Sequence, residues 1–209
     1  VADLDNPASV TRDSEIIDHT GDAAGLMTVI GGKYTTHRAL GEDVLRHVEK
    51  ALGLDHLPSS TRQALFPGTP AAPLARFRKT FVSRSVLPDR SATRLADLYG
   101  AQAHVIESLV VADPALAEVI DDETGAVAAE VVHAVREEGA VTLEDVLLRR
   151  TAIALNSDVA LAAAPRAAAV LVAHADWEPT RADAELARYR ESVRRFRPRA
   201  LAAEHVTSP

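Results

Sequence analysis

Two glycines and a lysine stand where a run of apolar residues gives way to a helical pattern, and their types suit the binding of an anionic group. Gly31-Gly32-Lys33 follow directly on the apolar run of residues 26–30. The glycines let the backbone approach a bound group closely, and Thr35 and Thr36 are candidates to cap the first helical turn. A helix start carries a partial positive charge, to which Lys33 adds a full one. The turn is therefore suited to an electron-rich group such as a phosphate, a carboxylate or the pyrimidine edge of a reduced flavin.

The same local pattern has two plainer interpretations. Glycines after a strand often serve chain reversal alone, and a lysine in such a turn is often only solvated. The turn is not a Walker A loop, because that motif requires a glycine where Met27 stands and Ser or Thr where Tyr34 stands.

The elements predicted to position the turn are a β-hairpin and a helix. Residues 14–19 and 26–30 read as strands joined by turn-forming residues. A two-stranded hairpin is only marginally stable alone, so we expect further sheet from outside this chain or from a second copy of it. Residues 35–52 are predicted to form a helix with one apolar face, and Gly53 suits its C-terminal end. That face comprises Leu40, Val44, Val48 and Leu52.

The rest of the chain reads as a connector followed by helices. Residues 54–72 are rich in Pro, Ser and Gly. The predicted domains are 1–56 (hairpin and helix), 57–72 (linker) and 73–209 (helical domain). Within the last, helices are predicted over residues 74–86, 91–99, 102–112, from about 127 to 139, from 158 to 175 with an interruption near Pro165, and over the stretch that ends near residue 196. Thr142 and Asp145 resemble a capping box. The fold class is mainly α.

Composition excludes several kinds of site. The chain has 209 residues, a net charge of −7 and no cysteine, so it has no disulfide, no thiolate nucleophile and no cysteine-ligated metal. The eight histidines show no His-x-x-x-His spacing, and no serine lies in a Gly-x-Ser-x-Gly motif. Two short basic runs, Arg149-Arg150 and the run around Arg194, lie in an acidic protein, which argues against nucleic-acid binding. We expect Arg149 and Arg150 to pair with acidic groups on neighbouring helices.

Three sequence blocks together resemble one family. The blocks are Thr11-Arg12-Asp13, Ile30-Gly31-Gly32-Lys33-Tyr34-Thr35-Thr36-His37-Arg38, and Glu144-Asp145-Val146-Leu147-Leu148-Arg149-Arg150-Thr151. In order and approximate spacing they resemble the C-terminal part of the flavin-dependent (aerobic, respiratory) glycerol-3-phosphate dehydrogenases. The resemblance extends from residue 11 to about residue 157. Tyr34 and His37 depart from the family pattern, which commonly has Leu and Tyr at these positions.

The resemblance implies roles for individual residues. Lys33 would lie beside the flavin and the substrate, as a catalytic and substrate-binding residue. Gly31, Gly32, Thr35 and Thr36 would hold the pyrimidine side of FAD. Arg12 would face the substrate, where its planar guanidinium suits a phosphate. The physical logic agrees for Lys33, since hydride arrival at flavin N5 places negative charge at N1 and the C2 carbonyl.

The resemblance also implies that this chain is the C-terminal portion of a longer enzyme. It opens with Val-Ala-Asp and contains no Gly-x-Gly-x-x-Gly fingerprint. The intact enzyme would oxidise glycerol 3-phosphate to dihydroxyacetone phosphate and pass electrons through FAD to quinone. We expect the chain alone to be inactive and not to retain FAD without the missing N-terminal FAD domain. We expect a cytoplasmic location, and both a homodimer and peripheral attachment to the inner face of the cell membrane are left open.

Two other functions remain open at this point. Residues 73–209 can instead be a helical docking module without catalysis, in which Arg149→Glu and Arg150→Glu would abolish association and leave folding intact. A different flavin enzyme, an amine or hydroxy-acid oxidase, is disfavoured because the block of residues 144–151 is not expected there.

Overall fold

The computed structural model describes residues 14–196, and the chain divides into two compact units, residues 1–65 and 66–209. We call the described part of the first the hairpin unit and the described part of the second the helical unit. The division lies within the predicted connector of residues 54–72. The exact domain limits given above stay a prediction.

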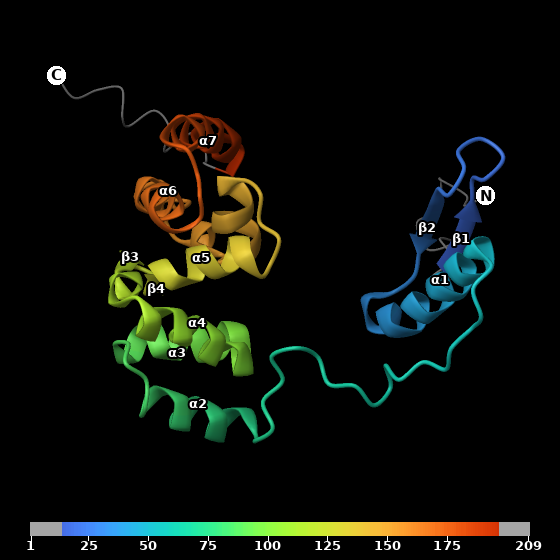
Figure 1. Ribbon diagram of the computed structural model, residues 1–209, viewed down its shortest axis with the longest axis horizontal. Coiled ribbons are helices and arrows are strands. Elements are labelled where there is room, and N and C mark those ends of the chain that lie inside the picture. The colour runs from blue at the N-terminus through green and yellow to red at the C-terminus, as the bar shows by residue number, and fades with distance from the viewer. Residues whose placement is uncertain (1–13, 197–209) are drawn as a thin grey trace. The chain divides into compact units, whose positions relative to one another are not determined.

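The hairpin unit begins with two antiparallel strands, β1 (Ser14–Asp18) and β2 (Met27–Gly31) (Figure 1). Their register runs without a shift from Ser14 opposite Gly31 to Asp18 opposite Met27. The predicted β-hairpin is confirmed, with each strand within a residue of its expected limits.

A 3-10 turn, η2 (Tyr34–Thr36), leads from the hairpin into α1 (His37–Leu52). This helix ends at Gly53, which has a left-handed φ of 66° and donates its N–H to the carbonyl of Lys50 at 3.3 Å. Glycine adopts this conformation without strain, so the predicted role of Gly53 at the helix end is confirmed.

The first residues after α1 fold back against that helix. The Thr61 hydroxyl donates to the Glu42 carboxylate at 2.7 Å, and the Arg38 guanidinium donates to the Thr61 hydroxyl at 3.1 Å. Hydrogen bonds from Ser59 and Thr61 lower the pKa of Glu42 to about 2. The start of the predicted connector is therefore held to α1 by polar contacts.

The hairpin unit encloses no apolar core among its described residues. The one buried residue there is Glu49, at 9% exposure. Large apolar side chains with exposed fractions between 51% and 72% are Leu26, Ile30, Leu52, Leu54, Leu57 and Leu65. Much of the apolar surface that a folded unit normally buries is thus open.

The helical unit contains six α-helices among its described residues, and each packs against the next along the chain (Figure 1). They are α2 (Leu74–Val82), α3 (Asp89–Tyr99), α4 (Ala103–Ala112), α5 (Ala128–Arg136), α6 (Ala163–His174) and α7 (Pro179–Ser192). Shorter helical segments are η3 (Gly100–Gln102), η4 (Pro114–Ala117), η5 (Asp145–Arg150), η6 (Ile153–Leu155) and η7 (Val193–Phe196). The predicted mainly α fold class is confirmed.

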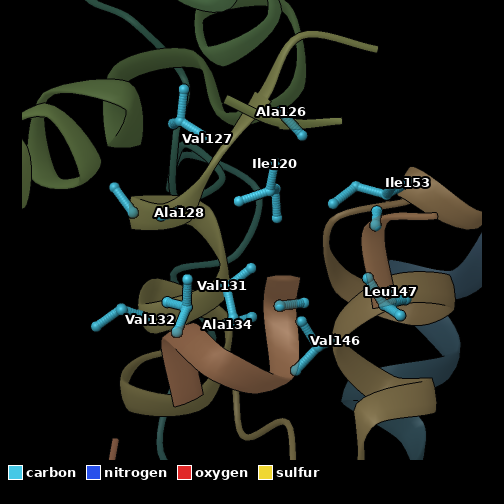
Figure 2. Close-up of a cluster of buried hydrophobic side chains, with 14 of the residues drawn as sticks. Ile120, Ala126, Val127, Ala128, Val131, Val132, Ala134, Val146, Leu147 and Ile153 are labelled. Atoms are coloured by element: carbon cyan, nitrogen blue, oxygen red, sulfur yellow. The ribbon is translucent and has the colours of Figure 1, made fainter. Parts of the chain in front are cut away.

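The core of the helical unit is built largely from alanine and from aliphatic side chains. Figure 2 shows its central part, where α5 meets η5 and η6. The side chains labelled there are Ile120, Ala126, Val127, Ala128, Val131, Val132, Ala134, Val146, Leu147 and Ile153, each with at most 1% exposure. Small residues let the helices approach closely, which explains how a chain with few aromatic side chains fills its interior.

Three predicted helices have wrong limits, and the one predicted from about 127 to 139 ends at Arg136. The helix predicted over residues 74–86 ends at Val82, and a turn follows in which the Arg84 N–H donates to the Phe81 carbonyl at 3.1 Å. The helix predicted to begin at residue 158 begins at Ala163.

Left-handed backbone accounts for the late start of α6. Val159 and Ala160 have φ values of 58° and 55°, which a right-handed helix cannot include. Asp158 does accept an N–H, that of Ala162 at 2.8 Å, but ahead of the helix. Pro165 is the third residue of α6, where its missing N–H costs no helical hydrogen bond, so it does not interrupt the helix.

The predicted capping box is confirmed, and the segment it begins is a π-helix, η5. The Asp145 carboxylate accepts the Thr142 N–H at 2.9 Å, and the Thr142 hydroxyl accepts the Asp145 N–H at 3.1 Å. Burial alone would raise the pKa of Asp145, but hydrogen bonds from Thr142 and Val141 and the charge of Arg149 outweigh it and lower this pKa to about 2. The π-helical geometry of η5 is not predicted by any sequence signal.

A second, very short hairpin was not predicted. It joins β3 (Val119–Asp121) to β4 (Ala126–Val127). Strands of three and two residues are too short to show an alternating pattern.

Within residues 14–196, no helix is long and apolar enough to cross a bilayer. No group of three or more His, Cys, Asp or Glu side chains there is arranged to hold a metal ion.

Candidate functional site

The candidate site is the turn between β2 and α1, and its glycines are needed for the direction of the chain. Gly31 and Gly32 have φ values of 79° and 86°, in the region that strains residues with a side chain. A Cβ on Gly32 would lie 3.5 Å from Leu40 Cδ2 and 3.6 Å from Ser14 Cβ, which are ordinary contacts. The backbone conformation, and not lack of space, therefore requires glycine at this position.

Lys33 follows the glycines in extended backbone, at the start of η2. The Thr36 hydroxyl donates to the Lys33 carbonyl at 2.9 Å and lies 3.3 Å from the Lys33 N–H, which it accepts. The Thr36 side chain makes no hydrogen bond to the first N–H groups of α1. The prediction that Thr36 caps this helix with its side chain is therefore wrong. Its hydroxyl instead fixes the backbone of Lys33 against the helix start.

The turn is open at the surface. Lys33, Thr35 and Thr36 are exposed, and Tyr34 is 92% exposed. No ion pair or hydrogen bond involves the Lys33 ammonium among residues 14–196. The candidate residues Gly31, Gly32, Lys33, Thr35 and Thr36 thus form one exposed, positively charged turn that can accept an anion. Arg12, the other predicted site residue, lies outside the described residues.

The two residues that depart from the family pattern contact each other beside Lys33. The rings of Tyr34 and His37 lie with their centroids 5.7 Å apart, and His37 Nδ1 lies 2.8 Å from the Tyr34 carbonyl oxygen. Both residues are exposed.

Arg149 forms ion pairs, but not with the predicted partners. Its guanidinium lies 2.7 Å from Glu144 and 2.8 Å from Asp145, within its own segment. The expected pairing with a neighbouring helix is wrong for Arg149. Glu144 does bind across the fold, because Arg195 in η7 also reaches its carboxylate, at 3.2 Å.

The residues that join distant parts of the helical unit were missed from sequence. Arg94 Nε in α3 donates to both carboxylate oxygens of Glu130 in α5, each at 3.1 Å. The Tyr99 hydroxyl and the Val127 N–H donate to the same carboxylate at 3.0 Å each, and Arg94 also donates to the Thr151 carbonyl. Burial raises the pKa of Glu130, and Arg94 opposes that rise. Nothing in the sequence pairs residues 36 positions apart.

The helical unit matches a known domain family. Residues 59–182, more than half of the chain, match the model of the C-terminal domain of alpha-glycerophosphate oxidase.

The chain is also similar to curated proteins over most of its length. It is 35% identical over 185 residues to a glycerol-3-phosphate dehydrogenase from Synechocystis sp., a match that covers 88% of this chain and 34% of that protein. It is 29% identical over 174 residues to glycerol-3-phosphate dehydrogenase 2 from Mycobacterium tuberculosis, covering 82% of this chain and 30% of that protein. The chain spans about a third of the length of these relatives. With its fold and the match over residues 59–182, this chain belongs to the family of the C-terminal domain of alpha-glycerophosphate oxidase.

Proposed function

We propose that this chain is the C-terminal part of an FAD-dependent glycerol-3-phosphate dehydrogenase, which oxidises glycerol 3-phosphate to dihydroxyacetone phosphate and passes electrons to quinone. The observation that carries the proposal is the similarity to the Synechocystis protein. A match of 185 residues within a chain of 209 necessarily spans residues 31–36 as well as most of the helical unit. The similarity therefore extends over part of the hairpin unit and is not confined to the helical unit.

The groups present at the turn fit the pyrimidine side of a flavin. An exposed ammonium without a partner among the described residues, glycines with no side chain in the way and a helix start without a side-chain cap favour an anionic or electron-rich group. In the proposed enzyme Gly31, Gly32, Thr35 and Thr36 hold that side of FAD, and Lys33 lies beside it. A bound FAD would supply the acceptor for the hydride that leaves C2 of the substrate.

Lys33 in this proposal acts by its charge. A fixed ammonium in a site from which water is excluded stabilises the negative charge that develops as the substrate is oxidised. The hydrogen bonds between Thr36 and Lys33 hold the Lys33 backbone at the start of η2, from which the side chain extends. Arg12 binds the substrate phosphate, for which a guanidinium is well suited.

The open surface of the hairpin unit supports the need for further protein around the turn. A two-stranded hairpin is marginal by itself, and no apolar side chain among the described residues of this unit is buried. In the proposed enzyme an FAD domain covers this apolar surface, extends the sheet and binds the adenine and ribose half of the cofactor. The 209-residue chain expressed alone is then colourless and inactive, and a flavin absorption spectrum in the purified chain would contradict this.

The test is the activity of the full reading frame that encodes this chain. We expect a yellow protein that reduces a soluble quinone with glycerol 3-phosphate. Lys33→Gln should lower kcat by about a hundredfold, the usual effect of removing one group that stabilises developing charge. Lys50→Gln is the matched control, because Lys50 is an exposed lysine at the other end of α1.

The outcomes separate the proposed enzyme activity from the proposed role of Lys33. If the protein encoded by the full reading frame does not oxidise glycerol 3-phosphate, the proposed activity is overturned. If Lys33→Gln is fully active with FAD bound as in the unmodified enzyme, only the role of Lys33 is overturned.

A further inference from the structure

A hollow of about 460 Å³ lies in the helical unit, away from the candidate turn in sequence. Its walls come from the end of α3, from α4 and from the C-terminal end of α5. The volume is within the range of about 300 to 1,000 Å³ typical of small-molecule sites. Leu98 and Val105 give it an apolar wall, and both remain more than 40% exposed.

A buried histidine without a partner lines this hollow. His133 is 4% exposed, and its Nδ1 has no hydrogen-bond partner. Its ring lies edge-on to the Tyr99 ring, with centroids 5.8 Å apart. Packing against Tyr99 therefore fixes the imidazole but leaves Nδ1 unsatisfied, and an unsatisfied buried nitrogen is uncommon enough to need an explanation.

A second unpartnered polar atom lines the same hollow. Glu138 Oε2 is buried and accepts no hydrogen bond, and Glu137 beside it is exposed. Both carboxylates follow the C-terminal end of α5, where the helix carbonyls already carry a partial negative charge. Placing two more negative charges there is unfavourable for folding alone, and such local conflicts are typical of functional sites.

The charged side chains that line the hollow are all acidic. They are Glu137 and Glu138, and no Lys or Arg lines the hollow. The nearby Arg94 is engaged by Glu130 and by the Thr151 carbonyl. Burial chiefly raises the pKa of Tyr99, and the negative charges of Glu130 and Glu138 raise it further.

We infer that this hollow binds a small organic cation, an ammonium or guanidinium group carried on a short apolar stem. Glu138 Oε2 accepts one N–H of the cation, and His133 Nδ1 accepts another in the tautomer that carries its proton on Nε2. The stem lies against Leu98 and Val105. This inference does not depend on the proposed dehydrogenase activity.

Other classes of ligand fit less well. An anion would meet Glu137 and Glu138 without a cation in the lining to offset them. A metal ion is disfavoured because no three suitable ligand side chains converge within residues 14–196. A neutral alcohol would leave the Glu138 charge uncompensated.

The test is an NMR titration of the isotope-labelled 209-residue chain, following the His133 ring signals and the Leu98 and Val105 methyl signals. The probes are n-butylammonium, N-butylguanidinium and, as the neutral control, 1-butanol. We expect at least one cation to shift these signals in a saturable way, with a Kd about tenfold lower than that of 1-butanol, the effect of one charge-assisted hydrogen bond. Cations that bind no more tightly than 1-butanol would overturn the inference.

Variants locate the binding within the hollow. Glu138→Gln keeps the size of the side chain and should raise the Kd of the cation about tenfold. Glu178→Gln is the matched control, because Glu178 is exposed and lies before α7. Equal cation affinity in both variants would contradict the assignment to Glu138. The comparison of the cations with 1-butanol needs no variant. It therefore tests whether the hollow prefers a cation even if Glu138→Gln fails to fold.

A further probe identifies the source of the cation. Acetyl-Leu-Arg-amide carries the same guanidinium group on a peptide backbone. Tighter binding of this peptide than of N-butylguanidinium would indicate a side chain from a protein segment. Weaker binding of the peptide would indicate a free small molecule, and either result supports the inference.

Discussion

Removing Arg94 should destabilise the helical unit severely, because Glu130 would keep a buried charge with no cation beside it. Of the hydrogen bonds that Glu130 accepts, the two from Arg94 would be lost, and those from the Tyr99 hydroxyl and the Val127 N–H would remain. The buried Thr151 would also lose the donor to its carbonyl. Breaking a buried ion pair in this way costs about 3 to 5 kcal/mol. We expect Arg94→Met to lower the free energy of unfolding by that amount at pH 8.

The cost should depend on pH in a defined direction. Burial raises the pKa of Glu130 in the folded state above its ordinary value of 4.5, and loss of Arg94 raises it further. The folded variant therefore binds the Glu130 proton more tightly than the unfolded chain does. The destabilisation relative to the unmodified chain grows as pH rises from the folded-state pKa of Glu130 in the unmodified chain, which is itself above 4.5, to the still higher pKa in the variant, by at most about 1.4 kcal/mol per pH unit.

Chemical denaturation followed by tryptophan fluorescence measures this effect in the helical unit alone. The single tryptophan, Trp177, is 4% exposed and lies just before α7. Arg166→Met is the control, since its pair with Glu118 is exposed and such pairs contribute about 0 to 1 kcal/mol. Adding Glu130→Gln to Arg94→Met should recover stability at pH 8. A loss below about 1 kcal/mol for Arg94→Met, or a loss that is the same at pH 5 and pH 8, would refute the reasoning.

Two further predictions concern stability, each measured as a free energy of unfolding by the same fluorescence assay. Gly100→Ala should cost about 3 kcal/mol, because its Cβ would lie 2.1 Å from the Gly68 carbonyl oxygen at a φ of 55°. Gly139→Ala, with a φ of 67° and no atom within 4 Å, should cost only about 1 kcal/mol, so equal costs would contradict the clash. Asp145→Asn should cost about 1 kcal/mol at pH 7. Because the folded-state pKa of Asp145 is about 2 against 3.8 for the free side chain, the Asp145→Asn difference should disappear as pH falls from 3.8 towards 2. A difference that persists at low pH would show that the charge of Asp145 is not what stabilises the cap.

Local sequence signals were sufficient for the hairpin unit. The turn between the strands, the apolar run before Gly31 and the spacing of four in α1 each depend on residues close in sequence. The role of Gly53 at the end of α1 also depends on nearby residues alone, because its N–H bonds to carbonyls of the last helical turn. The candidate turn was predictable for the same reason, since its residues are consecutive in the chain.

Helix limits in the helical unit were less predictable, because competing hydrogen bonds set them. The Ser83 hydroxyl donates to the Thr80 carbonyl at 3.0 Å, where α2 gives way to a turn. Pro88, which directly precedes α3, lies well beyond the end of α2 and does not set its limit. At the start of α6, the Tyr189 hydroxyl donates to the Val159 carbonyl at 2.7 Å, a tertiary contact that accompanies the left-handed backbone there.

The buried polar groups of the helical unit were beyond sequence reasoning. Arg94 and Glu130 are ordinary charged residues in amphipathic helices, and only the folding of α3, α4 and α5 into one unit brings them together. His133 likewise follows the helical pattern of α5, and its unpartnered nitrogen becomes evident only when the surrounding helices are in place. Charged residues are usually exposed, so sequence alone favours the surface for all of them.

The reduction potential of FAD in the enzyme encoded by the full reading frame tests the central claim most directly. If the Lys33 ammonium stabilises negative charge on the reduced cofactor, Lys33→Gln should lower the two-electron midpoint potential by about 30 mV or more, which corresponds to about 1.4 kcal/mol. Lys50→Gln should leave the potential unchanged. An unaltered potential in Lys33→Gln, with FAD fully bound, would contradict the claim that this turn serves the flavin.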